Sequence, residues 1–165
     1  MAAETNVTRT RPDQRRLLVF GELSQVMPEV RRLVPGYQAV GNWTLAQICK
    51  HLADSFDGSL DGFDLSVHRL KRFFIHRQML NRALTKGIPP GYTVNENLTP
   101  PRGVELEPAV DALSRAMDRY ENHSGNLHAH PLFGQLPRPM WDRVHCMHTA
   151  HHLSFAIPRR CATAL

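Results

Sequence analysis

The chain has 165 residues, of which 42% are hydrophobic, and its Lys and Arg residues outnumber Asp and Glu to give a formal net charge of +5. This length is enough for one buried core, so we expect a single domain over residues 13–158, with a flexible N-terminal segment 1–12 and a C-terminal tail 159–165. No stretch approaches the roughly 18 apolar residues of a membrane span, and residues 1–12 lack the apolar centre of an export signal, so we expect a cytoplasmic protein without a membrane partner.

The first predicted helix runs from Asp13 to about Val34. Its apolar residues recur at steps of three and four, as in an amphipathic helix: Leu17, Phe20, Leu23, Met27, Val30 and Val34. Pro28 lies inside this pattern and should kink the helix, because proline lacks the backbone N–H that an interior helical residue donates. We therefore expect a long, bent N-terminal helix.

The second predicted helix, from Thr44 to Leu60, begins at a capping box formed by Thr44 and Gln47. A stripe of apolar side chains should face the core: Leu45, Cys49, Leu52, Ala53, Phe56 and Leu60. His51 lies off this stripe, on the side that carries Gln47, Asp54 and Ser55. This arrangement favours a polar groove at the edge of a helical bundle, with His51 facing the groove.

The third predicted segment, from Asp64 to about Lys86, either extends the second helix past Gly62 or forms a separate helix. Its apolar positions are Val67, Leu70, Phe74, Leu80 and Leu84. It also contains the densest basic run of the chain, HRLKRFFIHRQMLNR, whose charges alternate with apolar core positions and not with exposed aromatic residues. Such a distribution is typical of the solvated face of a helix, so we do not expect a nucleic-acid partner despite the net charge.

A long segment, residues 87–107, is too rich in Pro and Gly for a simple connector, and loops of this length are commonly functional or disordered. A fourth helix is predicted from Pro108 to about Asn122 by the apolar stripe Val110, Leu113, Met117 and Tyr120.

The three cysteines, Cys49, Cys146 and Cys161, lack the spacing of a metal site. We expect Cys49 and Cys146 to be buried packing residues and not a disulfide.

The last predicted helix, from Pro139 to Phe155, contains the sequence HCMHTAHHLSF. Its four histidines share one face with large apolar residues and should therefore point inward: His145, His148, His151 and His152, with Trp141, Val144 and Phe155. His148 and His152 are spaced i, i+4, the geometry by which one helix supplies two metal ligands. The pair His148 and His151, spaced i, i+3, is also geometrically possible.

A third ligand must come from another element, because catalytic zinc usually takes three protein ligands and keeps one position for water or substrate. His51 is the best candidate, and the second and last helices must then be adjacent and antiparallel.

Other polar residues are placed for a contact to a ligand or to substrate. His145 lies one turn before His148, His151 lies on the inward face, and two residues share the side of His51: Gln47 and Asp54. The loop histidines His128 and His130 are interpreted as solvated or turn-capping residues.

Three segments carry a family resemblance: WTLAQICKHLA, HPLFGQLPRPMW and HTAHHL. They resemble the DinB-like superfamily of small bacterial four-helix proteins, which includes the YfiT-like metalloenzymes, and in particular a branch of unassigned function. The similarity runs from about Leu17 to Phe155 and implies an all-α four-helix bundle with one extra helical segment and long loops. The resemblance to DinB-like proteins implies that the loop 87–107 could cover the metal groove. The tail IPRRCATAL departs from the DinB-like pattern, because Pro158 ends the last helix early.

In such families one histidine on the second helix and an H-x-x-x-H pair on the last helix bind a divalent metal, commonly zinc or nickel. By position, the resemblance implies that His51, His148 and His152 are the ligands and that His151 is not.

Two functional classes follow from these observations. The first is a divalent-metal-dependent enzyme, in which neutral imidazole ligands leave the ion its full positive charge to activate water or a thiolate. The resemblance implies a thiol-dependent transferase with a low-molecular-weight thiol as cosubstrate, or a hydrolase, acting on a small-molecule substrate. The alternative is a non-catalytic binding or stress-response module whose histidines staple the bundle. Structural zinc sites usually have four protein ligands, so a site with only three histidine ligands favours the enzyme over the binding module. A homodimer is a possible assembly.

Overall fold

The computed structural model describes residues 14–63, 73–89 and 99–159, and most of these residues are helical. The helices are α1 Val26–Leu33, α2 Leu45–Asp61, α3 Phe73–Lys86, α4 Leu106–Asn122 and α5 Arg138–Leu153. A short 3-10 turn, Leu23–Gln25, precedes α1, and two short strands complete the described elements: β1 Tyr37–Ala39 and β2 Ala156–Pro158. None of the described helices combines the length and the apolar character needed to cross a bilayer.

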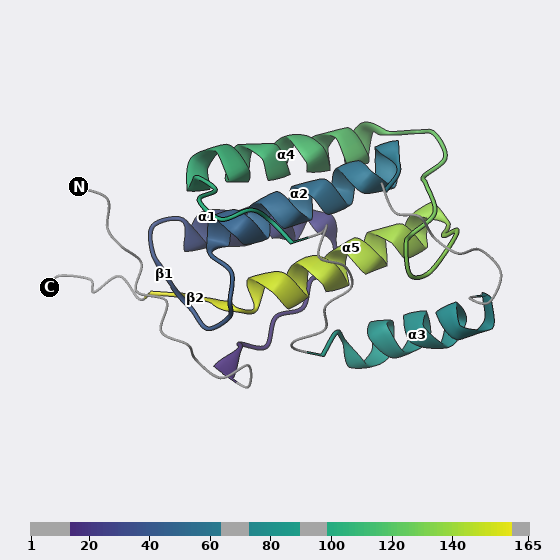
Figure 1. Cartoon of the computed structure of the whole chain (residues 1–165), viewed down its shortest axis with the longest axis horizontal. Coiled ribbons are helices and arrows are strands. Elements are labelled where there is room, and N and C mark those ends of the chain that lie inside the picture. Colours follow the sequence, from purple (N-terminus) through teal and green to yellow (C-terminus); the bar gives the residue numbers. More distant parts are fainter. Residues whose placement is uncertain (1–13, 64–72, 90–98, 160–165) are drawn as a thin grey trace, which may run out of the picture.

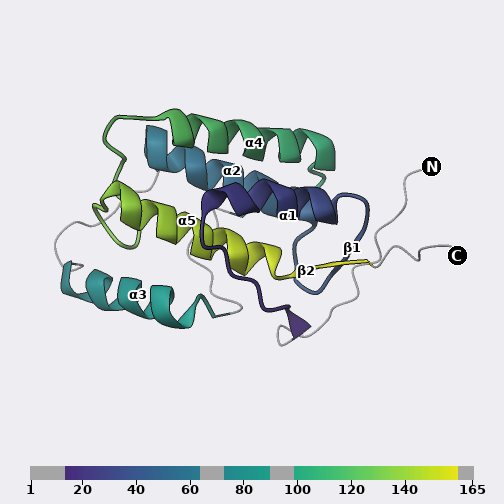
Figure 2. The same ribbon diagram turned by 180° about the vertical axis from the view of Figure 1, so that it is seen from behind.

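The helices α4, α2, α5 and α3 follow one another across the molecule, and α1 lies over the face formed by α2 and α5 (Figures 1 and 2). Contacts between α2 and α5 fix their relative direction. His51 contacts His152, Ser55 lies near His148, and Ser59 lies near His145, so residue numbers rise along α2 as they fall along α5. The prediction that the second and last helices are adjacent and antiparallel is therefore confirmed.

The core lies between α1, α2, α4 and α5. Its largest fully buried side chains include Leu33, Phe56, Leu113, Tyr120 and Trp141, which come from all four of these helices. The expected apolar stripe of α2 is buried except at Leu60, which is partly buried against the core. Cys49 and Cys146 are buried free cysteines, as the sequence predicted. Burial of this apolar surface is the main term that holds the helices together.

Both ends of α2 are set by local sequence. The Thr44 side chain accepts a hydrogen bond from the Gln47 backbone N–H at 3.2 Å, and the Gln47 side chain accepts one from the Thr44 N–H at 3.1 Å. Gly62, at φ 96°, ends the helix in a conformation that other residues adopt only with strain. The third segment is therefore a separate helix, and its predicted positions Val67 and Leu70 lie outside the described residues.

The N-terminal helix is much shorter than the sequence predicted. Residues 15–22 are not helical, and the Arg16 N–H donates to the Ser154 carbonyl at 3.1 Å, so this segment runs beside the end of α5. Leu17 and Val34, which the periodicity placed on a buried stripe, are 96% and 38% exposed. Pro28 is the third residue of α1 and introduces no interior break, because the first-turn N–H groups of a helix have no intrahelical acceptor to lose.

A small sheet corrects the prediction of an all-α fold. β1 and β2 pair antiparallel, with Gln38 opposite Ile157, and β2 begins shortly after α5 ends at Leu153. Phe155, expected in the last helix, instead accepts a hydrogen bond at its carbonyl from the Val40 N–H at 2.8 Å. The last helix therefore ends two residues before Phe155, because the chain there forms backbone hydrogen bonds with the segment that leads into α2. The expected segment 1–12 and most of the tail 159–165 lie outside the described residues.

Candidate metal centre

Three imidazole rings converge between α2 and α5. Nε2 of His148 lies 3.1 Å from Nε2 of His51 and 3.0 Å from Nε2 of His152. One ligand atom from each of these residues lies within 4.8 Å of the other two, close enough for all three to hold one metal ion. The structure thus brings together the three residues that the sequence predicted as ligands.

The spacing of the three nitrogen atoms fits a small divalent ion. Zinc-to-nitrogen distances near 2.1 Å in a tetrahedral site place neighbouring ligand nitrogen atoms roughly 3.4 Å apart. The observed separations from His148 are 3.1 and 3.0 Å, so the rings need to move apart only slightly to admit an ion. Imidazole nitrogen suits zinc and nickel, which matches the expected metals.

Neighbouring side chains hold the rings in this arrangement. Trp43 stacks on His152 with centroids 5.1 Å apart and an interplanar angle of 6°, and it meets His51 at 4.9 Å. Ser55 Oγ lies 3.4 Å from Nδ1 of His148. When Nδ1 of His148 carries the proton and donates it to Ser55, Nε2 keeps a lone pair for the metal, as in ligand histidines whose second nitrogen is hydrogen-bonded.

The two α5 histidines of this group, His148 and His152, are held in their neutral form. Burial lowers the pKa of His148 well below its ordinary value, and the neighbouring rings of His152 and His51 lower it further. The pKa of His152 is lowered by burial and then by His51 and His151. Because a metal ligand must be deprotonated, both imidazoles are available for binding at neutral pH.

The His151 ring lies beside the His152 ring, with centroids 4.9 Å apart, but it is not part of the group of three. Its Nδ1 lies 3.2 Å from Nη1 of Arg15, a group that only donates, and Arg15 also donates to the Ile88 carbonyl at 3.2 Å. Burial and then the Arg15 charge lower the pKa of His151 to about 4. His151 is therefore neutral and hydrogen-bonded outside the group of three rings.

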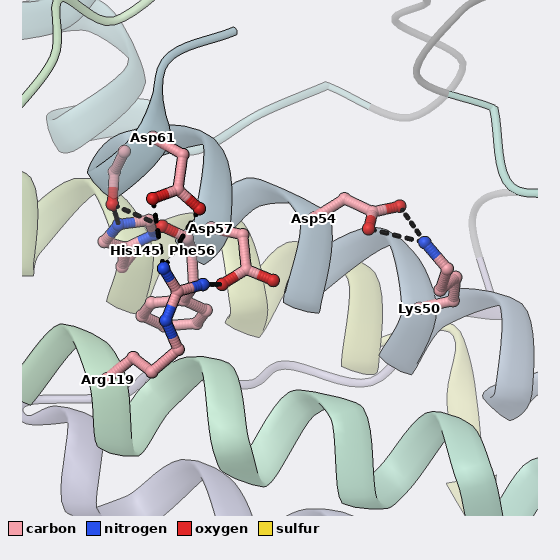
Figure 3. A network of polar contacts seen from close by, with 8 residues as sticks. Lys50, Asp54, Phe56, Asp57, Asp61, Arg119 and His145 are labelled. Carbon is pink, nitrogen blue, oxygen red and sulfur yellow. Dashed lines mark hydrogen bonds and ion pairs between the residues drawn. The ribbon is translucent and has the colours of Figure 1, made fainter.

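His145 is a core residue. It is 1% exposed and stacks on Phe56 with centroids 4.0 Å apart and on Trp141 at 5.0 Å, while its Nε2 lies 3.4 Å from Ser59 Oγ. Figure 3 shows the ring beside Phe56, away from Lys50 and Asp54. Burial lowers its pKa to about 3. The expected contact of His145 with substrate stays a prediction without support from this packing.

The two polar residues expected beside His51 have different surroundings. Asp54 is exposed and accepts two hydrogen bonds from Nζ of Lys50 at 2.5 and 2.7 Å, as Figure 3 shows. Gln47 is engaged by the capping box and donates from Nε2 to the carbonyls of Pro100 and Pro101 at 3.4 and 3.2 Å. Gln47 thus connects the Pro100–Pro101 part of the long loop to α2. Of the two residues, only Asp54 lines the cavity described next.

A cavity of about 570 Å³ adjoins the three histidines. Its wall includes Trp43, Asp54 and Ser55, the C-terminal half of α3, residues 87–89, Thr99, residues 130–133 and the inner face of α5. Residues 87–89 and Thr99 of the long loop 87–107 therefore line the cavity, while residues 90–98 lie outside the described part of the chain. His130 also lines it, and its Nδ1 accepts hydrogen bonds from the N–H groups of Leu132 and Phe133 at 3.0 and 3.2 Å. His128 is exposed and is not part of the group of three rings.

Sequence reasoning missed two parts of this site. Trp43 was not recognised as a neighbour of the ligand rings, although its position immediately before the capping residue Thr44 fixes it at the start of α2. The sequence also contained no indication that α3 supplies an apolar wall of the cavity, which includes Met79 and Ala83. The reason is that α3 approaches α5 only through the tertiary fold.

The geometry defines a mostly helical protein with a candidate three-histidine metal centre beside a cavity. The family model described as "Protein of unknown function (DUF1569)" matches residues 12–159, and the chain belongs to this family. No curated protein and no solved structure matches the chain.

Proposed function

We propose that this protein is a divalent-metal-dependent enzyme whose ion, zinc or nickel, is held by His51, His148 and His152. The observation that carries the proposal is the convergence of three imidazole nitrogen atoms, within 4.8 Å of one another, beside a cavity of about 570 Å³. We further propose a relationship to the DinB-like superfamily, supported by the placement of these histidines on α2 and on α5, the last described helix.

The ligand number favours catalysis over a purely structural role. Among the residues that the structure describes, no fourth His, Cys, Asp or Glu joins the group. Structural zinc sites are usually closed by four protein ligands, whereas catalytic sites keep a position for water or substrate. The three rings also border the cavity, so a molecule in the cavity can reach an ion held by them.

The chain's own residues prepare this site for chemistry. Trp43 and Ser55 contact the rings, and burial keeps His148 and His152 neutral, so that each ring has a lone pair available for an ion between them. A divalent ion at that point lowers the pKa of a bound water or thiol and stabilises negative charge that develops in the transition state. The reaction class we propose is thiol-dependent group transfer, with a low-molecular-weight thiol as cosubstrate, or hydrolysis; the thiol rests on the DinB-like resemblance.

The test begins with metal analysis of the purified, untagged protein, for which we expect one divalent ion per chain. Metal-stripped protein is then loaded separately with zinc, nickel, manganese or iron. Each form is assayed for transfer of several thiols to electrophiles and for ester and amide hydrolysis, with His51→Ala as the inactive control. Activity that appears only with a loaded ion and an intact His51 supports the proposal.

The rival is a non-catalytic module in which the metal only staples α2 to α5. In that case metal binding would add to the free energy of unfolding and to nothing else. If every loaded form is as inactive as His51→Ala while melting far above the stripped form, the enzyme proposal fails and the binding module replaces it.

A further inference from the structure

We propose that the cavity beside the three histidines binds a molecule with an uncharged, apolar body and a single anionic, metal-binding head group. This inference rests on the proposed metal function and adds the substrate class to it. The body lies between α3 and α5, and the head group meets the ion at His51, His148 and His152.

The first observation is the composition of the wall. Away from the three ligand rings, apolar side chains dominate the lining, and they come from four separate parts of the chain: Phe63, Met79, Ala83, Ile88, Leu132, Phe133, Val144 and Met147. Binding sites of about 300–1,000 Å³ with mainly apolar walls and a few polar groups are typical of small-molecule ligands. The cavity, at about 570 Å³, lies in the middle of that range.

The second observation is the extent of the wall along α5. Val144, Met147, His148, His151 and His152 line the cavity, and the eight helical steps from Val144 to His152 span roughly 12 Å. The ligand histidines His148 and His152 lie in the C-terminal half of this stretch, whereas Val144 and Met147 precede them. A molecule bound at the metal therefore has room for a body of several carbon atoms directed toward Val144.

The third observation concerns the polar groups of the lining. Nδ1 of His130 already accepts hydrogen bonds from the loop backbone, and Nδ1 of His151 faces Arg15. Asp54 is paired with Lys50, and Arg82 lies at an exposed position of α3. Beside His130, His151 and Asp54, a charge or an unpaired polar group on the ligand's body would therefore lose its hydration without gaining one of these groups as a partner.

The head group is determined by the ligands of the ion. Imidazole rings in their neutral form contribute no negative charge, so a divalent ion bound by three of them keeps its full charge toward the cavity. An anionic oxygen or sulfur on the ligand is therefore favoured at the open position, while the body that follows it is apolar.

The experiment measures the affinity of the zinc-loaded full-length protein for straight-chain hydroxamates, from acetohydroxamate to octanohydroxamate, by titration calorimetry. Each methylene group that enters the apolar cavity should raise the affinity about three- to fourfold until the cavity is filled. The chain-length effect is expressed as the ratio of octanohydroxamate to acetohydroxamate affinity, which removes any difference in head-group binding.

Two variants on α3 form a matched pair. Met79→Glu places a carboxylate in the apolar wall and should lower the octanohydroxamate-to-acetohydroxamate ratio at least tenfold. Gln78→Glu adds the same charge at the exposed neighbouring residue, outside the lining, and should keep the ratio of the natural protein. An equal fall of the ratio in both variants would contradict the placement of the body beside Met79.

The inference and the proposed function fail in different ways. If zinc binds and all hydroxamates bind equally well whatever their length, the apolar-body inference is wrong and the metal proposal stands. If the protein binds no zinc, the metal proposal and the head-group assignment both fall. The apolar wall is then tested in metal-free protein with straight-chain alcohols: affinity that rises with chain length supports it, and affinity independent of length overturns it.

Discussion

Replacing His152 by Ala should abolish tight binding of a divalent metal, whereas replacing its neighbour His151 by Ala should leave binding largely intact. Nε2 of His152 lies 3.0 Å from Nε2 of His148, inside the group of three rings. Nδ1 of His151 instead lies 3.2 Å from Nη1 of Arg15. The two variants remove the same side chain from adjacent positions, so each controls for the general effect of the other.

The size of the effect follows from the number of ligands. Apparent binding free energies of structural zinc sites with four ligands are about 10–16 kcal/mol, which is on the order of 3 kcal/mol for each ligand. Loss of one of the three imidazoles should therefore weaken zinc binding by about 10²–10³-fold. His152→Ala also removes the ring that stacks on Trp43, so its metal-free form should melt at a lower temperature than the natural protein.

The measurement is competition for zinc against a chromophoric chelator of known affinity at pH 7.5, with circular dichroism to establish that each variant is folded. Melting curves of the metal-free forms separate a loss of ligand from a loss of fold. If His151→Ala loses zinc and His152→Ala keeps it, the reasoning is refuted and the ligand pair on α5 becomes His148 and His151.

Three further predictions concern the support of the site. Ser55→Ala should weaken zinc binding about 10–100-fold with little change in melting temperature, because Nδ1 of His148 loses its hydrogen-bond acceptor. Unchanged zinc affinity would show that Ser55 does not orient His148. Burial lowers the pKa of His145 from 6.5 to about 3, so its contribution to stability is complete above about pH 6.5 and is lost as the pH falls toward 3. Between pH 6.5 and 5, the free energy of unfolding measured in urea should fall by about 2 kcal/mol less in His145→Phe than in the natural protein. If it falls equally in both proteins, this prediction is wrong. Thr44→Ala removes the hydroxyl that caps the Gln47 N–H and should lower the free energy of unfolding by about 1 kcal/mol in denaturant titrations, with Thr44→Ser as the control that retains the cap.

The parts of the fold that the sequence predicted correctly depend on local patterns. The capping box of Thr44 and Gln47 marks the start of α2, and periodic apolar residues define the buried faces of α2 and α4. The i, i+4 spacing of His148 and His152 placed two ligands on one face of α5, and one well-placed histidine elsewhere completed the group. In all of these cases except His51, neighbouring residues on one helix provide the evidence; His51 is predicted from its place on the polar side of its helix and by the family resemblance.

The parts that the sequence predicted wrongly depend on distant partners. Ala39 pairs with Ala156, and strands of three residues have too few alternating positions to reveal themselves without that partner. Similarly, the apolar residues before Val26 have helical spacing, but the Arg16 backbone donates to the Ser154 carbonyl and its side chain pairs with Glu29. Tertiary contacts thus override the local preference of residues 15–22, as they do for the end of the last helix at Phe155.

The pairing of β1 with β2 has a consequence for how the protein would take up an ion. β1 leads into α2 and β2 follows α5, and the Tyr37 hydroxyl also accepts a hydrogen bond from the Leu45 N–H at 2.9 Å. The sheet therefore joins the start of the helix that carries His51 to the end of the helix that carries His152. Because these protein contacts hold the two helix ends together, conformational entropy of gathering the ligands is lost when the chain folds. We therefore expect the rate of ion uptake to depend on dehydration of the ion and on its passage through the cavity, with little contribution from ordering of the chain.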